Sequence, residues 1–148
     1  MKRIMIDPSK CDGCKNCALA CMESHRKDGK TGVETLDFKD PANEARNDIV
    51  NDGTGGYLPM FCRHCGVPQC AGSCMSGALY QDEKTGHVLY NEERCGACFM
   101  CVMNCPYGIP KPDITRTKIL KCDFCMEREE GPACVAACPK NAIYVEEV

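Results

Sequence analysis

The stretch Cys95–Asp113 reads CGACFMCVMNCPYGIPKPD and contains four cysteines in the order C-x2-C-x2-C-x3-C, followed by proline. In iron–sulfur proteins this spacing lets three thiolates wrap one cluster while the fourth reaches a neighbouring cluster. The run from Cys11 repeats the spacing, and wider runs begin at Cys62 (C-x2-C-x4-C-x3-C) and Cys122 (C-x2-C-x8-C-x3-C). All 16 cysteines of the 148-residue chain therefore fall into four groups of four.

Three chemistries could account for so many cysteines: disulfides, structural zinc and iron–sulfur clusters. The chain begins MKRIMIDPSKC and shows no apolar segment of a signal peptide, so we expect a cytoplasmic protein with reduced thiols. Three cysteines at intervals of three would crowd one tetrahedral zinc ion, although the second and fourth groups could form two zinc knuckles. The pattern favours four [4Fe–4S] clusters as the cofactors.

Charge and motifs narrow the function classes. The formal charge is −3 and the basic residues are scattered, which argues against binding to nucleic acid. No run of about 18 apolar residues occurs, so we expect no direct membrane insertion. We find no Ser/His/Asp set, phosphate-binding loop or dinucleotide-binding glycine motif, and we expect no catalysis by the chain itself.

The segments between the cysteine groups predict an α+β fold class built from short elements. Three segments predict short strands: Lys2–Ile6, Lys118–Leu120 and Ala142–Glu146. Ala78–Gln81 and His87–Tyr90 predict a hairpin. Units this small bury too little apolar surface to be stable alone, so the clusters should hold them together and the apoprotein should be largely unfolded.

Several residues outside the cysteine set allow two interpretations. Ser24–Gly56 has no cysteine and is either a solvated excursion or a partner-docking element. Gly13, Gly66 and Gly96 lie inside the binding loops, where each either lets the backbone approach a cluster or simply permits a tight turn.

The three histidines are weaker candidates. His64 lies between Cys62 and Cys65, and we expect it to cover or tune a cluster rather than replace a ligand, because the cysteine count is already complete. We expect the other two, His25 and His87, at the surface.

The order and spacing of the four groups resemble the four-cluster subunits of the dimethyl-sulfoxide-reductase type, which serve molybdenum reductases, formate dehydrogenases and hydrogenases. Within that family, Phe61–Leu79 and Cys95–Asp113 are similar to CooF-type subunits of nickel carbon monoxide dehydrogenase. The segment Cys-Met-Ser-Gly-Ala, in place of the commoner Cys-Pro-Thr-Gly-Ala, is the particular cue.

The resemblance implies two bacterial-ferredoxin-like lobes. The outer cysteine groups would pair in a lobe of residues 1–23 and 118–148, the inner groups in a lobe of residues 57–117, with 24–56 as an insertion loop. The implied ligand sets are Cys11, Cys14, Cys17 and Cys138 (cluster 1); Cys21, Cys122, Cys125 and Cys134 (cluster 2); Cys62, Cys65, Cys70 and Cys105 (cluster 3); and Cys74, Cys95, Cys98 and Cys101 (cluster 4).

The resemblance also implies a function: the relay of electrons between a nickel carbon monoxide dehydrogenase and an acceptor such as a flavin NAD(P) oxidoreductase, a hydrogenase or a ferredoxin. Two alternatives remain open. The partner could be a formate dehydrogenase, a hydrogenase or a molybdenum reductase, or the clusters could be structural parts of an assembly module without a redox role.

Overall fold

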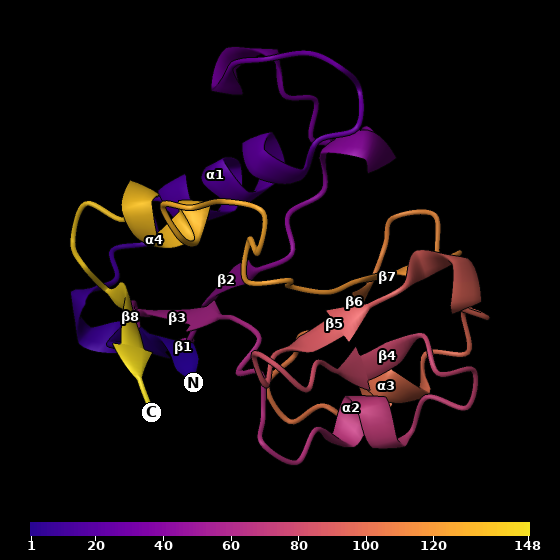
Figure 1. Ribbon diagram of the computed structural model, residues 1–148. Coiled ribbons are helices and arrows are strands. Elements are labelled where there is room, and N and C mark those ends of the chain that lie inside the picture. The colour runs from indigo at the N-terminus through magenta and orange to yellow at the C-terminus, as the bar shows by residue number, and fades with distance from the viewer.

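The computed structural model describes residues 1–148 and shows an α+β protein of short helices and four two-stranded sheets. Its elements gather in two groups, one holding both chain termini and the other made from the middle of the chain (Figure 1). The longest helix has ten residues, and no helix combines the length and the apolar character needed to cross a membrane. The predicted α+β class of short strands and helices is thus confirmed.

The group with the termini is closed by a sheet that joins the two ends of the chain. Strand β1 (Lys2–Ile6) runs antiparallel to β8 (Ile143–Glu147), with Ile4 opposite Val145. Helix α1 (Asn16–His25) packs on α4 (Ala133–Ala137). A second sheet pairs β2 (Asp48–Asn51) with β3 (Tyr57–Met60).

The second group also consists of two helices and two two-stranded sheets. Helix α2 (Gln69–Gly72) packs on α3 (Met100–Asn104), beside the hairpin of β4 (Leu79–Gln81) and β5 (Val88–Tyr90). In the hairpin turn the Asp82 carboxylate accepts from the backbone N–H and the hydroxyl of Thr85, and Gly86 takes φ +76°. A short ladder of β6 (Lys111–Pro112) and β7 (Ile119–Leu120) completes it. The expected strands and hairpin are confirmed, with ends shifted by about one residue.

Four 3-10 turns, η1 (Pro8–Lys10), η2 (Val33–Thr35), η3 (Pro41–Asn43) and η4 (Glu92–Arg94), punctuate the loops. Asp7, Asp40 and Asn91 each cap one of them by accepting from an N–H two residues later. Cys11 and Cys95 follow directly, closing η1 and η4 with their own N–H groups. The caps therefore deliver the first cysteine of two groups in an extended conformation.

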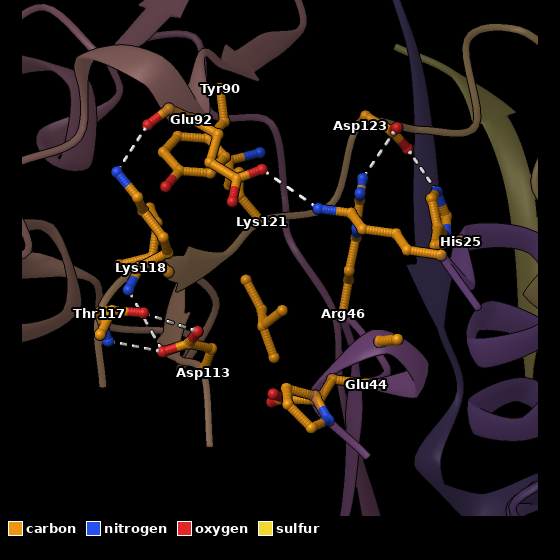
Figure 2. A pocket seen from close by; sticks show the side chains of 15 residues that line it. His25, Glu44, Arg46, Tyr90, Glu92, Asp113, Thr117, Lys118, Lys121 and Asp123 are labelled. Carbon is orange, nitrogen blue, oxygen red and sulfur yellow. Dashed lines mark hydrogen bonds and ion pairs between the residues drawn. The ribbon is translucent and has the colours of Figure 1, made fainter. Parts of the chain in front are cut away.

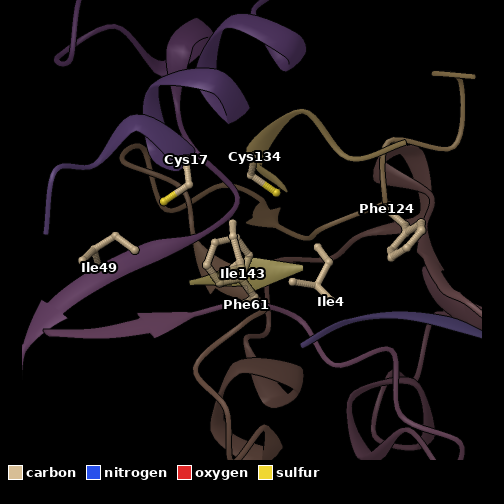
Figure 3. Packing of buried hydrophobic residues seen from close by; sticks show 7 residues of the cluster. All are labelled: Ile4, Cys17, Ile49, Phe61, Phe124, Cys134 and Ile143. Atoms are coloured by element: carbon tan, nitrogen blue, oxygen red, sulfur yellow. The ribbon is translucent and has the colours of Figure 1, made fainter. Parts of the chain in front are cut away.

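The cores are small and include cysteines. One consists of Ile4, Cys17, Ile49, Phe61, Phe124, Cys134 and Ile143 (Figure 3). The other has Leu79, Cys101 and Ile119. Cores this small bury too little apolar surface to stabilise the fold alone, which supports the expectation that a group bound by the cysteines contributes to folding.

The 24–56 segment is more integrated than a loop. Asn43, Ala45, Asn47 and Ile49 are all buried, which is the two-residue period of an extended chain with one face covered. The segment supplies β2 as well. The interpretation of the segment as a purely solvated excursion is therefore wrong for its second half. The pattern was not visible in the sequence because two of its buried positions are asparagines, and polar residues do not indicate a core position.

Candidate iron–sulfur sites

The structure brings the sixteen cysteines together in four hollows, each lined by three cysteines of one group and the last cysteine of another. We call them quartets 1 to 4. Quartet 1 is Cys11, Cys14, Cys17 and Cys138; quartet 2 is Cys21, Cys122, Cys125 and Cys134; quartet 3 is Cys62, Cys65, Cys70 and Cys105; quartet 4 is Cys74, Cys95, Cys98 and Cys101. These are the same sets that the family resemblance implies, and all sixteen cysteines are free thiols.

Helix packing explains why the groups exchange their last cysteines. Cys17 and Cys21 lie four residues apart on α1, a rise of about 6 Å, so the two sulfurs serve different hollows. Helix α4 carries Cys134, and Cys138 caps its end. Because α1 and α4 pack together, Cys17 meets Cys138 at one end of the pair and Cys21 meets Cys134 at the other. Helices α2 and α3 repeat the arrangement for quartets 3 and 4.

All four binding loops share a left-handed residue two positions after their first cysteine. It is Gly13 (φ +74°), His64 (φ +43°), Ala97 (φ +56°) and Phe124 (φ +60°). Three of them are not glycine, so composition alone could not reveal the position. The conformation turns the backbone N–H of His64 towards Cys62 Sγ and that of Phe124 towards Cys122 Sγ, both at 3.4 Å.

The three glycines singled out from the sequence differ from one another. Gly13 has a positive φ, and a Cβ there would lie 2.6 Å from the Tyr57 ring. Gly66 and Gly96 need no positive φ; a Cβ would meet only the Arg3 side chain, at 3.7 Å, in the first case and nothing within 4 Å in the second. A protein contact requires glycine only at Gly13, and the approach of Gly66 and Gly96 to a cluster stays a prediction.

Burial sets the chemistry of the thiols. It raises the pKa of Cys17 to about 12 and of Cys101 to about 11, and it raises the pKa of Cys134 still further. Such thiols stay protonated near neutral pH unless a cation binds the sulfur. Burial opposes ionisation at Cys138 too, but N–H groups of Ile143 and Ala142 outweigh it and lower the pKa. Crowded buried thiols with donors aimed at sulfur fit a cationic metal cluster.

The two histidines expected at the surface are not there. His87 is only 5% exposed, and its Nε2 lies 2.9 Å from the Lys2 carbonyl. His25 is partly buried and pairs with Asp123 at 3.1 Å. His87 is covered where β5 approaches Lys2 of β1, and His25 where α1 approaches Asp123, and a sequence pattern cannot reveal either contact.

His64, His87 and Phe124 meet where the two groups of elements touch. The His87 ring stacks on Phe124 at 4.4 Å, and His64 stands edge-on to His87 at 4.9 Å. Val88 donates its N–H to His64 Nδ1 at 3.1 Å, and burial lowers the pKa of His64 to about 2, so the ring is neutral. His64 is not among the residues that line the hollows of quartets 2 and 3.

A polar cavity of about 430 Å³ lies between the 24–56 segment and the central part of the chain (Figure 2). Some of its charges are paired: Asp123 accepts from Arg46 at 2.9 Å and pairs with His25, and Lys27 pairs with Glu92 at 3.1 Å. Lys121 also lines the cavity and is in no ion pair. The backbone N–H of Arg46 also points at Cys21 Sγ, at 3.2 Å. The cavity thus lies beside quartet 2. Side-chain atoms of His25, Asp123 and Cys125 that could bind a metal lie within 4.8 Å of one another, and Cys125 is itself a quartet 2 cysteine.

Comparison with known proteins agrees with this donor set. The model of a family described as "4Fe-4S dicluster domain" matches residues 54–148. The chain is 35% identical to the electron transport protein HydN of Escherichia coli K12, over 95% of this chain and 85% of that protein. It is 38% identical to the B subunit of the anaerobic dimethyl sulfoxide reductase of the same organism, over 93% of this chain and 69% of that subunit.

The chain belongs to the 4Fe-4S dicluster ferredoxin family. A solved benzoyl-coenzyme A reductase complex, BamBC with 1,5-dienoyl-CoA, contains a chain with the same fold, at a TM-score of 0.52 and 23% identity over all of this chain and 78% of that one. The family match covers the second, third and fourth cysteine groups. The first group lies outside it, and the similarities to HydN and to the reductase subunit extend over it.

As a member of this 4Fe-4S family the chain is an iron–sulfur protein. The family membership explains why buried thiols, unstable as isolated thiolates, gather in sets of four. It also explains the left-handed position of the loops, because a backbone that wraps a compact inorganic core must turn sharply between ligands.

Proposed function

We propose that the chain is an electron-transfer subunit that holds four [4Fe–4S] clusters, one in each quartet, and makes or breaks no substrate bond itself. The observation that carries the proposal is the sorting of all sixteen thiols into four hollows of four. Each bound cluster would supply one-electron chemistry. The similarity to an electron transport protein and to a reductase subunit supports this function.

The chain's own residues would hold and tune the clusters. The quartet cysteines would bind iron, and backbone N–H groups such as those of Arg46, His64 and Phe124 would donate to the bound sulfurs. Donors to sulfur stabilise the more negative, reduced form, so they raise a potential. The His64, His87 and Phe124 rings would exclude water between quartets 2 and 3.

Pairs of cysteine substitutions test the proposed exchange between the outer cysteine groups, which defines the proposed lobe of residues 1–23 plus 118–148 against that of residues 57–117. The structure moves two of these bounds by a few residues, because β3 lies with the group that holds the termini and Ile119 of β7 packs with Leu79 and Cys101 of the other group. Cys11→Ala with Cys138→Ala removes two ligands of one quartet, so one cluster should be lost. Cys134→Ala with Cys138→Ala removes one ligand from each of two quartets, so two clusters should change. Iron analysis and electron paramagnetic resonance count the altered clusters; the reverse outcome would mean that each cysteine group binds its own cluster.

For the partner, we propose a nickel carbon monoxide dehydrogenase as donor and a flavin NAD(P) oxidoreductase, hydrogenase or ferredoxin as acceptor. The support is the segment Cys74–Ala78 (CMSGA), which is similar to CooF-type subunits. The relatives favour a second candidate, a formate dehydrogenase, hydrogenase or molybdenum reductase partner, because one of them is a reductase subunit. Purifying the native complex and measuring nickel against molybdenum and tungsten separates the two.

A role in assembly with purely structural clusters is the competing function of another class. It predicts clusters that resist reduction at every accessible potential. A reductive titration followed by electron paramagnetic resonance therefore decides between relay and scaffold, because a relay must show reversible one-electron reduction of its clusters.

A further inference from the structure

Lys121 is a buried lysine without a carboxylate partner. Its exposed fraction is 2%, which makes it one of the largest fully buried side chains of the protein. It forms none of the ion pairs of the molecule, and the neighbouring Asp123 is already engaged by His25 and Arg46. A buried ammonium with no compensating anion is strongly destabilising, so its charge requires an explanation.

The contacts of the Lys121 ammonium place it between two cysteine quartets. Its Nζ donates to the carbonyl of Cys122, a quartet 2 cysteine, at 2.7 Å. It also donates to the carbonyl of Val88 at 2.8 Å, and Val88 lines the hollow of quartet 3. One cation therefore lies at the place where the two groups of elements meet, next to both hollows.

A cluster bound in each hollow would supply the missing anion. An oxidised [4Fe–4S] core with four thiolates carries a net charge of about −2, and one-electron reduction makes it about −3. A nearby buried cation stabilises the reduced form more than the oxidised form, because the attraction grows with the negative charge and is weakly screened away from water.

We propose that Lys121 is a shared counter-charge that raises the reduction potentials of the two clusters held by quartets 2 and 3 above the values they would have without it. The inference rests on the proposed function. In this proposal Lys121 acts through its positive charge and does not bind iron. The two clusters next to Lys121 then hold an electron more readily.

The test compares anaerobically prepared, cluster-loaded protein with Lys121→Met, Lys121→Arg and Lys84→Gln. Methionine has a similar length without charge, arginine keeps the charge, and Lys84 is an exposed lysine of the β4–β5 turn. Iron is measured first: wild-type protein without about sixteen iron atoms per chain would refute the proposed function itself. Each cluster potential is then measured by a titration followed by electron paramagnetic resonance.

In Lys121→Met we expect two of the four potentials to fall. At the wild-type midpoint the reduced-to-oxidised ratio of those clusters should drop on the order of tenfold, which is about 59 mV for one electron. The other two potentials should stay, Lys121→Arg should restore the wild-type values, and Lys84→Gln should change nothing. Four unchanged potentials, an equal shift of all four, or a shift as large in the arginine variant would overturn the proposal.

If Lys121→Met loses iron, Lys121→Gln provides the second neutral variant, because its amide can still donate to one of the two carbonyls. Iron lost from both neutral variants but kept in Lys121→Arg supports the counter-charge, since arginine is the one variant that keeps the positive charge. Iron lost from the arginine variant as well would overturn the proposal, because the shape of lysine and not its charge would then be what the site requires.

Discussion

Phe61 is the residue whose removal should most clearly uncouple the core from the cysteine sites. It directly precedes Cys62 of quartet 3, yet its ring lies in the core formed with Ile4 and Ile143, the residues of the terminal sheet (Figure 3). Phe61 therefore connects the start of the quartet 3 loop to the part of the fold that holds quartets 1 and 2.

The magnitude follows from its burial. Phe61 is 2% exposed, and its neighbours sit on paired strands that cannot easily collapse into the space. Phe61→Ala should therefore destabilise the folded protein by about 3–5 kcal/mol, the range for a buried phenylalanine whose cavity stays open. Because loss of a cluster is irreversible, this should appear as unfolding that is on the order of a hundredfold faster.

The assay is the rate at which visible absorbance of the clusters disappears in denaturant under anaerobic conditions. Phe38→Ala is the matched control, since Phe38 is 65% exposed and its truncation should change stability by less than about 0.5 kcal/mol. Equal rates for the Phe61 and Phe38 variants would refute the reasoning, because the ring would then contribute nothing to holding the sites together.

Three further predictions concern the loops and the metal. Gly13→Ala should destabilise the fold by at least about 1–2 kcal/mol, because a left-handed residue gains a Cβ that meets Tyr57. Gly96→Ala should destabilise it less, because the φ of Gly96 lies outside the left-handed region. Thermal bleaching of the cluster absorbance compares the two variants, and an equal loss of stability would contradict the strain argument. Arg26→Gln should expose residues 26–37 to limited proteolysis, because the Arg26 side chain is 5% exposed and binds Asp28 at 2.8 Å. Arg26 lowers the pKa of Asp28 to about 2, so this stabilisation is complete above the usual value of 3.8 and is lost as the pH falls towards 2; wild-type protection that vanished between pH 7 and pH 5 would speak against it. Finally, chelation of the iron should abolish cooperative unfolding in circular dichroism, and a native-like melt of the apoprotein would disprove cluster-dependent folding.

Local patterns in the sequence were sufficient to predict the short strands, the hairpin and the set of sixteen cysteines. Cysteine spacing identified all sixteen cysteines that the structure gathers into four hollows, because the spacing between ligands is a local property of the chain. The strand Lys2–Ile6 and the hairpin around Asp82 were also predictable, since alternation and turn residues act over a few positions.

Tertiary structure decided the features that depend on distant partners. Which cysteine groups share a hollow follows from α1 packing on α4, and no local spacing encodes that choice. The buried Asn47, the covered His87 and the buried ammonium of Lys121 all arise where segments far apart in the chain meet. Polar residues are normally taken for surface, and only the packed structure shows which of them are enclosed and which charges must therefore be balanced.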